Sequence, residues 1–310
     1  MKYCFGIDVG GTTVKMGLFQ VDGVLLDKWE IKTRTENGGE AILPDIAKSM
    51  EDKLAEKGID KSDIAGVGMG VPAPVTKDGI VFATANLGWG YKEVKRELEE
   101  LTGFTANIGN DANVAALGEM FKGAGKGYKN LIMITLGTGV GGGIIIDEKI
   151  LVGTHGAGAE IGHIHVNDEE TEHCGCGRTG CLEQYASATG IVRLAKRKLA
   201  VCQEETVLVK ESVTAKDVFD AVKAGDKVAN EIAEEFGKYL GHALSNIAVI
   251  TDPEIFVIGG GVSKAGEVIL PYIEGPYKEK MFFANQLVKF VLAELGNDAG
   301  IYGAAKLALG

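Results

Sequence analysis

Long apolar runs are missing from this sequence of 310 residues. No stretch approaches the roughly 20 apolar residues that a membrane-spanning helix needs, and residues Met1–Phe5 lead into a glycine turn without the apolar core of a signal peptide. Positive charge is also in short supply, because 32 Lys and Arg stand against 43 Asp and Glu, for a net charge of −11. This balance disfavours nucleic acid or an anionic membrane as the main partner. We therefore expect a cytoplasmic protein with neither of these partners.

Cysteine is scarce, and its five residues are unevenly placed. In a cytoplasmic protein, free or metal-bound thiols are favoured over disulfides. Cys4 and Cys202 stand apart from the other three and are expected to be ordinary core or surface residues. Low-complexity segments and polar linkers are absent as well, so the two domains that this length allows are expected to be joined closely.

Glycine, in contrast, is abundant: 45 of the 310 residues are glycine, about twice the usual share of roughly 7%. We interpret the excess as hairpins and ligand loops, because many glycines stand in turns between apolar runs. Two of these turns share one pattern, in which a Gly/Thr turn joins two apolar runs as in a tight β-hairpin. They are Asp8-Val9-Gly10-Gly11-Thr12-Thr13 and Thr135-Leu136-Gly137-Thr138-Gly139-Val140.

Both turns are suited to phosphate. Glycine lets a ligand approach the backbone closely, and such turns direct several N–H groups and threonine hydroxyls toward one point. One such turn would be weak support, but two that face each other could hold one nucleoside triphosphate from both sides. Asp8, before the first turn, could hold Mg²⁺ directly or through water, or could simply form the turn. Lys15, after the turn, could contact the nucleotide or be a solvated strand residue.

Apolar periodicity predicts an α/β protein with two similar halves. Each half opens with three strands linked by turns and continues with alternating helices and strands. The first half is expected to have strands at 3–9, 14–20, 24–32, 64–71 and 104–108 and helices at 41–57, 91–101 and 111–121; the second begins near residue 131 and has a helix at 227–250, a strand at 255–258 and a final helix at 299–309.

Two copies of a βββαβα core, each opened by a phosphate-type hairpin, are the layout of the actin-like ATPase (ribonuclease H-like) fold. We expect a smaller N-terminal lobe at 1–120, completed by a C-terminal helix at 297–310, and a larger C-terminal lobe at 121–296. The nucleotide is expected in a cleft between the lobes, a common place for ligand sites.

Asp111 follows a predicted strand and opens a predicted helix. It could be the N-cap of that helix. The catalytic hypothesis is that its carboxylate takes the proton of a substrate hydroxyl as this attacks the γ-phosphate, and a helix N-terminus favours the ionised carboxylate. A general base contributes roughly 10²–10⁴ in rate, and the rest of phosphoryl transfer is positioning and charge neutralisation.

Three of the cysteines stand within eight residues of a glycine-rich loop, at Cys174, Cys176 and Cys181. Three thiolates and one imidazole make a closed tetrahedral site that suits structural Zn²⁺. The alternative is three reduced thiols in a turn. The histidines that could supply the fourth ligand are His155, His163, His165 and His173, of which His173 adjoins a cysteine and His163 returns from an earlier segment.

Glu160, His163 and Glu183 flank this loop. Carboxylates and an imidazole hydrogen-bond with hydroxyls, so the cluster suits a sugar better than an apolar or anionic substrate. Recognition of neighbouring hydroxyls would also discriminate strongly between sugars. Each glutamate taken singly is more often a solvated surface residue.

Five motifs in order resemble those of the ROK family of sugar kinases and sugar-sensing repressors, and within it the bacterial glucokinases. The resemblance covers nearly the whole chain, and the five motifs are specific together though not singly. They are Asp8-Val9-Gly10-Gly11-Thr12, Gly109-Asn110-Asp111-Ala112-Asn113, Leu136-Gly137-Thr138-Gly139-Val140-Gly141-Gly142-Gly143, Glu160-Ile161-Gly162-His163 and Cys174-Gly175-Cys176-Gly177 with Gly180-Cys181-Leu182-Glu183.

The resemblance implies an ATP-dependent hexose kinase with Asp111 as the catalytic base. It implies that Asn110, Glu160, His163 and Glu183 bind sugar hydroxyls, and it places Asn86 in a stretch near the substrate. His163, Cys174, Cys176 and Cys181 would bind zinc, with the other nitrogen of His163 facing the sugar. Gly260 and Gly261 match the segment that lies along the adenosine. The family also forms dimers and tetramers, so we expect a homodimer or homotetramer.

Two small departures from the family pattern lie near the predicted sugar side. Ala73 stands between two prolines where the family more often has glycine, and Ala159 precedes Glu160 where a second glycine is commoner. They leave open whether the sugar is glucose, mannose, fructose, allose or N-acetylmannosamine. The rival function is a ROK repressor, but only seven residues precede Asp8, and a DNA-binding segment would have to fit there. A filament-forming subunit would share the hairpins without needing the zinc loop.

Overall fold

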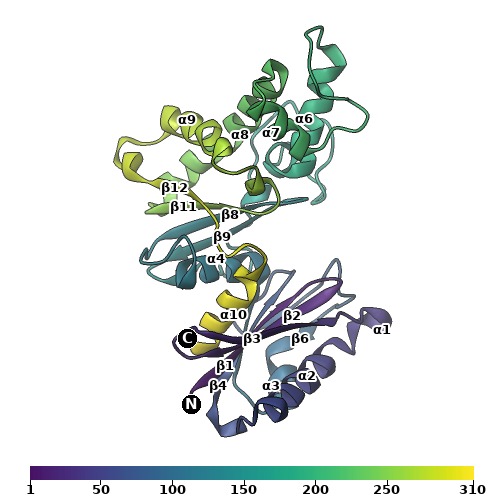
Figure 1. The fold of residues 1–310 in the computed structure, drawn as a ribbon, viewed down its shortest axis with the longest axis vertical. Helices are drawn as coiled ribbons and strands as arrows, with labels where there is room; N and C mark the ends of the chain where they lie inside the picture. The colour runs from purple at the N-terminus through teal and green to yellow at the C-terminus, as the bar shows by residue number, and fades with distance from the viewer. The chain divides into compact units, whose positions relative to one another are not determined.

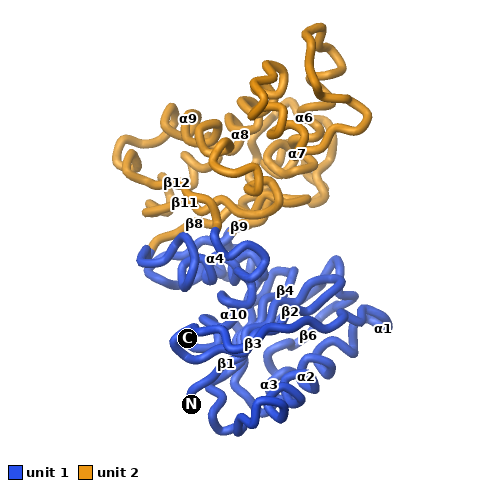
Figure 2. Tube along the Cα trace, viewed as in Figure 1, with its two compact units in different colours: residues 1–129, 143–159, 294–310 blue, residues 130–142, 160–293 orange.

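The computed structural model describes residues 1–310, which divide into two compact units (Figure 2). Unit 1 comprises residues 1–129, 143–159 and 294–310, and unit 2 comprises residues 130–142 and 160–293. Compared with the predicted lobes, these units place the first boundary after residue 129 and group residues 143–159 with unit 1.

The first sheet has the strand order β3-β2-β1-β4-β7. Strands β1, β2 and β3 are antiparallel neighbours, while β4 and β7 continue the sheet parallel to β1. The antiparallel set and the parallel extension follow the predicted order of elements. The bounds are β1 Tyr3–Val9, β2 Thr13–Gln20, β3 Leu25–Lys32, β4 Ile64–Val71 and β7 Ala106–Asn110.

Helices cover both faces of this sheet (Figure 1). Because side chains alternate along a strand, Phe5, Ile7 and Val9 join one core together with residues of α2 and α3. Cys4 and Phe19 point to the other face, where they pack against α10. The helices are α2 Ile42–Lys57, α3 Val94–Thr102, α4 Asp111–Lys122 and α10 Ala299–Leu309.

Glycines let α10 lie unusually close to the sheet and to α4. A Cβ atom on Gly6 or Gly68, in the strands, would overlap a carbonyl oxygen of α10, and one on Gly303 would overlap the carbonyl oxygen of Val114 in α4. Our interpretation of the glycine excess as turns and ligand loops is therefore incomplete. Part of the excess lies inside strands and helices, where the missing side chain allows backbone-to-backbone packing.

The second sheet repeats this arrangement with the order β10-β9-β8-β11-β12. Its strands β8, β11 and β12 are parallel neighbours, and β9 and β10 are antiparallel. The repeated order confirms the predicted duplication of the core. The bounds are β8 Leu131–Leu136, β9 Val140–Ile146, β10 Lys149–Ile150, β11 Ile255–Gly259 and β12 Lys289–Leu292.

The long helix α8 of unit 2 spans Lys227–Thr251 and buries the predicted apolar face, including Val228, Ile232 and Phe236. Helices α6, α7 and α9 were not assigned from the sequence. Helix α7 did have a readable signal, because Thr214 and Asp217 form a capping box at its start. The remaining helices of unit 2 are α5 Glu183–Ala186, α6 Ala188–Val201, α7 Ala215–Lys223 and α9 Leu270–Lys280.

Helix α3 begins at Val94, three residues later than predicted, because Lys92 and Glu93 pair with Ile80 and Val81 in a small sheet of strands β5 and β6. No helix is both long and apolar enough to span a membrane. The short elements are α1 Glu36–Gly39, β5 Ile80–Val81, β6 Lys92–Glu93 and the 3₁₀ turns η1 Lys61–Asp63, η2 Ile161–His163, η3 Val262–Ala265, η4 Glu267–Ile269, η5 Phe283–Leu287 and η6 Gly296–Asp298.

Candidate active site

The carboxyl ends of three parallel strands of unit 1 bring predicted site residues to one edge of the sheet. In the register, Asp8 of β1 pairs with Gly70 of β4, and Val71 pairs with Asn110 of β7. Asp8 and Asn110 therefore lie at the same end of strands β1 and β7, which flank β4 in the sheet, and Asp111 follows at the start of α4. This edge is where ligands bind in open α/β sheets.

The Asp8 carboxyl group lies against the first turn of α10. A Cβ atom on Gly300 would stand 2.6 Å from the Cγ atom of Asp8, so only glycine at position 300 leaves room for the Asp8 carboxylate. Burial raises the pKa of Asp8, and the charge of Lys15 opposes that rise. Lys15 stands opposite Asp8 in the register, and its Nζ donates to the backbone oxygen of Asn297 at 3.1 Å. A buried carboxylate beside one lysine is a group that a divalent cation would stabilise.

The first phosphate-type turn is closed by its own backbone and held by β3. The N–H of Gly10 donates to the oxygen of Thr13 at 3.0 Å, and the N–H of Thr33 donates to the oxygen of Thr12 at 2.9 Å. The hydroxyl of Thr33 donates to the oxygen of Gly10 at 2.7 Å. Gly11 is exposed and faces Asn86, whose Cβ atom would lie 3.2 Å from a Cβ on Gly11. The structure thus places Asn86 beside the first turn.

Asn110, not Asp111, caps helix α4. Its Oδ1 accepts the N–H groups of Ala112 at 3.0 Å and Asn113 at 3.2 Å, and its Nδ2 donates to the oxygen of Ala73 at 3.2 Å. The alternative that Asp111 is the N-cap is therefore wrong. Asp111 is the first helical residue, half-buried, with its Oδ1 accepting the N–H of Ala112 at 2.8 Å.

In unit 2, the structure gathers one histidine and three cysteines into a cluster suited to a metal ion. The ligand atoms of His163, Cys174, Cys176 and Cys181 all lie within 4.8 Å of one another. Cys176 Sγ and Cys181 Sγ are 3.6 Å apart, and Cys174 Sγ is 3.8 Å from Nδ1 of His163. Zinc–sulfur bonds of about 2.3 Å place the sulfurs of a tetrahedral site about 3.8 Å apart. The four residues therefore fit a zinc ion.

The chemistry of the thiols agrees with this geometry. A backbone N–H of Arg178 lowers the pKa of Cys176 to about 6, which favours its thiolate. Burial raises the pKa of Cys181 to about 12, so its thiolate requires a cation nearby. Of the other candidate ligands, His165 instead bonds to Asp168 at 2.8 Å, and His173 bonds to the oxygen of Gly177 at 3.1 Å.

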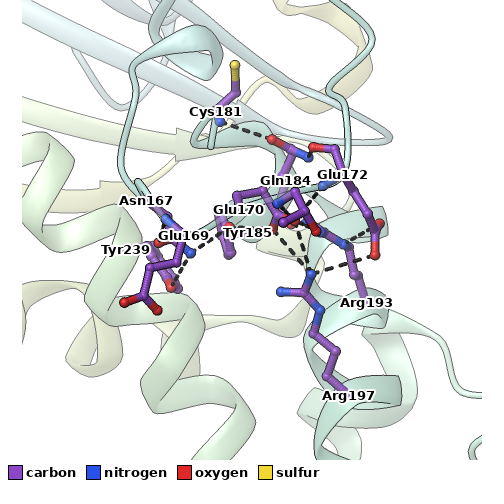
Figure 3. A network of polar contacts seen from close by, with 11 residues as sticks. Asn167, Glu169, Glu170, Glu172, Cys181, Gln184, Tyr185, Arg193, Arg197 and Tyr239 are labelled. Atoms are coloured by element: carbon purple, nitrogen blue, oxygen red, sulfur yellow. Dashed lines mark hydrogen bonds and ion pairs between the residues drawn. The ribbon is translucent and has the colours of Figure 1, made fainter. Parts of the chain in front are cut away.

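A buried ionic network supports the base of the cysteine-rich loop (Figure 3). The Glu170 side chain is 1% exposed, and Arg193 and Arg197 of α6 reach its carboxylate at 2.5 and 3.2 Å. Burial alone would raise the pKa of Glu170, but hydrogen bonds from Arg193 and Tyr185 outweigh it and lower the pKa to about 2. Gln184 extends the network to the loop, because its Oε1 accepts the N–H of Cys181 at 3.0 Å.

Glu183 joins the metal cluster to the second phosphate-type turn. Its Oε2 accepts the N–H of Val140 at 2.9 Å, and its Oε1 lies 3.6 Å from Cys174 Sγ. A Cβ atom on Gly139 would overlap the carboxylate. The carboxylate, the turn and the metal cluster are therefore in contact.

The second turn is also held by the start of helix α6. The N–H of Ala188 donates to the oxygen of Gly137 at 2.8 Å, and the hydroxyl of Thr189 donates to the oxygen of Thr138 at 2.8 Å. Gly260 follows β11 with φ +85°, and a Cβ there would stand 2.6 Å from the backbone of Leu136. The predicted adenosine segment at Gly260 therefore lies next to this turn.

Comparison with known proteins decides the family. The sequence model of the ROK family matches residues 4–310. The chain belongs to the ROK family.

Similar ROK proteins include both curated sequences and solved structures. A protein of Halalkalibacterium halodurans named Glucokinase is 44% identical over 97% of this chain and 93% of its own length. The crystal structure of a ROK family glucokinase from Streptomyces griseus, in complex with glucose and AMPPNP, is 34% identical with a TM-score of 0.75 and covers 98% of both chains. The crystal structure of a ROK hexokinase from Thermus thermophilus is 30% identical in sequence and has a TM-score of 0.83. It covers 98% of this chain and 97% of the hexokinase chain. The prediction of the actin-like ATPase fold is thereby confirmed.

The structure shows the contacts of Ala73 and the backbone conformation of Ala159, the two departures from the ROK pattern. The oxygen of Ala73 accepts the side-chain amide of the cap residue Asn110, so the Pro-Ala-Pro segment is tied to the start of α4. Ala159 has φ +67°, in the left-handed region that disfavours residues with a Cβ atom. This backbone conformation explains why glycine is commoner there, and it immediately precedes Glu160. Glu160 is exposed and leads into η2, which ends at His163.

Several residues that hold the ROK site residues in place carry no recognisable signal in the sequence, namely Thr33, Thr189, Glu170 and Arg193. Each lies outside the five motifs, and an isolated Thr, Glu or Arg has no local pattern that distinguishes it. The structure alone shows that their partners are distant in the sequence, such as Gly10 for Thr33.

Proposed function

We propose that this chain is an ATP-dependent glucokinase, a hexose kinase that transfers the γ-phosphoryl group of ATP to the C6 hydroxyl of glucose. The observation that carries the proposal is the 44% identity, over 97% of the chain, to a protein named Glucokinase. The Streptomyces griseus glucokinase, 34% identical, holds both glucose and the ATP analogue AMPPNP in its crystal structure.

Asp111 is the proposed general base. Its carboxylate takes the proton of the C6 hydroxyl while the oxygen attacks the γ-phosphorus and the bond to the leaving ADP oxygen breaks. Its place as the first residue of α4 fits this role, because Asn110 is the N-cap of the helix and the helix N-terminus favours an ionised carboxylate at Asp111. General-base assistance of this kind is worth roughly 10²–10⁴ in rate.

Sugar hydroxyls are proposed to bind to carboxylates, amides and one imidazole. Nδ1 of His163 faces the thiol cluster, which leaves Nε2 for a hydroxyl. Glu183 is held by the N–H of Val140 and so enters the reaction already oriented. The proposed sugar-binding residues are Asn86, Asn110, Asp111, Glu160, His163 and Glu183.

The nucleotide is proposed to bind through the two turns. Their N–H groups and threonine hydroxyls would contact phosphate oxygens, and Asp8 would hold Mg²⁺ directly or through water. The proposed nucleotide-binding residues are Asp8, Gly10, Gly11, Thr12, Thr13, Lys15, Gly137, Thr138, Gly139, Gly260 and Gly261.

Zinc, when bound by His163, Cys174, Cys176 and Cys181, supplies structure rather than chemistry on the substrate. It would fix the fold of the cysteine-rich loop and the ring orientation of His163. The homodimeric or homotetrameric assembly implied by the family, and the cytoplasmic location expected from the sequence, stay predictions.

The test is ADP release from MgATP with a panel of glucose, mannose, fructose, allose and N-acetylmannosamine. We expect the highest kcat/KM with glucose. Asp111→Asn should lower kcat at least a hundredfold, roughly 10² or more, while calorimetry still detects glucose binding. Asp52→Asn, on an exposed carboxylate of α2, is the control and should keep full turnover.

Each outcome decides something specific. A preference for another hexose would keep the phosphoryl transfer and change the substrate. Near-normal turnover of Asp111→Asn would remove this residue from the mechanism. Tight sugar binding without any turnover in the unmodified protein would favour a sugar sensor over a kinase.

A further inference from the structure

In each phosphate-type turn, one carbonyl group accepts a hydrogen bond from a threonine hydroxyl of a distant segment. Thr33, just after β3, donates to the oxygen of Gly10 at 2.7 Å. Thr189, in the first turn of α6, donates to the oxygen of Thr138 at 2.8 Å. The two threonines are not part of any repeated motif, yet each donates its hydroxyl to a backbone oxygen of one turn.

These bonds decide where the turn directs its N–H groups. A peptide unit is planar and trans, so its C=O and N–H bonds point in opposite directions. The oxygen of Gly10 shares a peptide unit with the N–H of Gly11, and the oxygen of Thr138 shares one with the N–H of Gly139. Once the hydroxyl holds the oxygen, the N–H of the following glycine must point away from the threonine.

A second bond from each segment makes the arrangement rigid. The backbone N–H of Thr33 donates to the oxygen of Thr12 at 2.9 Å, and the N–H of Ala188 donates to the oxygen of Gly137 at 2.8 Å. Each turn thus has two of its carbonyl groups held on one side. An N–H that needs no reorientation when an anion arrives contributes more to binding than one that must first be ordered.

We propose that Thr33 and Thr189 are positioning residues that aim the N–H groups of Gly11 and Gly139 at the phosphate groups of MgATP. This inference rests on the proposed nucleotide binding by the two turns. It adds that each turn depends on one hydroxyl from outside the phosphate motifs.

The two threonines differ in burial, which separates positioning from stability. Thr33 is 4% exposed and Gly10 is half-buried, so removal of the hydroxyl leaves the oxygen of Gly10 without this partner at a site of limited solvent access and also destabilises the fold. Thr189 is exposed, so water can replace its hydroxyl at the oxygen of Thr138 with little effect on stability. Thr189 is therefore the cleaner position for the test.

The experiment compares Thr189→Val and Thr189→Ser, and the same pair at Thr33, in the full-length protein. Valine keeps the shape without the hydroxyl, whereas serine keeps the hydroxyl. The control is Thr251→Val, which removes a hydroxyl that donates to the oxygen of Ile247 at 2.8 Å at the end of α8. The measurements are AMPPNP affinity by calorimetry, KM for MgATP and for glucose, and the thermal midpoint.

For Thr189→Val we expect AMPPNP affinity and kcat/KM for MgATP to fall about fivefold, since one hydrogen bond is worth about 1 kcal/mol and a tenfold change in affinity corresponds to about 1.4 kcal/mol. The KM for glucose and the thermal midpoint should stay near those of the unmodified protein, and Thr189→Ser should restore nucleotide binding. Unchanged AMPPNP affinity in Thr189→Val would overturn the proposal. So would an equal loss in Thr189→Ser.

The outcome is independent of the kinase assignment. If the unmodified protein binds AMPPNP but phosphorylates no sugar, the glucokinase proposal fails while the positioning role is still decided by calorimetry. If Thr33→Val does not fold, Thr189→Val alone decides it.

Discussion

The two phosphate-type turns are built alike but supported differently. The turn of unit 1 is held from its own sheet, because Thr33 directly follows β3 and donates two hydrogen bonds to the turn. The turn of unit 2 rests on Glu183, Ala188 and Thr189, a segment that follows directly on the last cysteine of the metal cluster. The same type of turn therefore depends on sheet packing in one unit and on a loop in the other.

The difference shows that each unit fixes the geometry of its turn by another means. In unit 1, glycines allow α10 to approach the sheet and α4 at backbone distance, and such close packing leaves little freedom. In unit 2, the segment from Glu160 to Leu182 contains a short 3₁₀ turn and two isolated β-bridges, His165 with Cys181 and His173 with Thr179, but no helix or strand longer than these. A loop of that kind requires cross-links, which the metal cluster and the Glu170 network supply.

The largest expected effect comes from removing zinc. Cys181→Ala should abolish equimolar zinc, measured by plasma mass spectrometry, and should weaken glucose affinity. A ligand present at 1,000 times its dissociation constant stabilises a fold by about 4 kcal/mol, so the unfolding of unit 2 should shift to lower urea. Cys202→Ala, at a half-buried cysteine outside the cluster, is the matched control and should keep the metal.

If Cys181→Ala still binds one zinc per chain, the ligand assignment is wrong, and the claim that zinc supports the turn of unit 2 is contradicted. The claim is also contradicted if chelation destabilises unit 1 as much as unit 2, which tryptophan fluorescence can report because both tryptophans, Trp29 and Trp89, lie in unit 1.

The second effect concerns the glycine packing of unit 1. In Gly68→Ala the new Cβ atom would lie 1.8 Å from the carbonyl oxygen of Ala304 and 2.9 Å from the backbone nitrogen of Ala308. Helix α10 would therefore have to move away from the sheet. We expect a loss of about 3 kcal/mol in the free energy of unfolding, measured in urea, without loss of zinc. Gly275→Ala is the control: it lies in helix α9 with no atom near its Cβ and should be neutral or stabilising by up to about 1 kcal/mol. An equally small effect of both substitutions would contradict the packing argument.

The smallest effect concerns the ionic network, and it depends on pH. Because the pKa of Glu170 is lowered from 4.5 to about 2 in the folded protein, its contribution to stability is present above pH 4.5 and is lost as the pH falls toward 2. Glu170→Gln should cost about 2 kcal/mol at pH 7, as loss of charged hydrogen bonds does, and less at pH 3.

Urea unfolding of Glu170→Gln and the unmodified protein at both pH values gives the measurement. Glu172→Gln, whose carboxylate is 65% exposed although it also pairs with Arg193, is the control and should change stability less. A difference between Glu170→Gln and the unmodified protein that stays constant from pH 7 to pH 3 would show that the charge of Glu170 does not stabilise the fold.

Much of the fold could be predicted because apolar periodicity and turn residues are local. Strand β1 and helix α8 lie where the pattern indicated. Helix α3 did not begin where expected, because the pairing of Lys92 and Glu93 with another segment overrides their helical tendency. The thiol cluster was foreseen as a site from spacing, but spacing left four histidines open, and the position of His163 among the sulfurs distinguishes it.

The duplicated order of elements, the two turns and the type of chemistry could be inferred from the linear pattern, since each strand, helix and motif is encoded in a run of nearby residues. Only the tertiary structure decided that Asn110 rather than Asp111 caps α4, that glycines such as Gly68 serve helix packing, and that Thr33 and Thr189 hold the turns. The physical reason is the same in each case. Hydrogen bonds and close contacts between segments far apart in the chain depend on distances that a linear pattern does not contain.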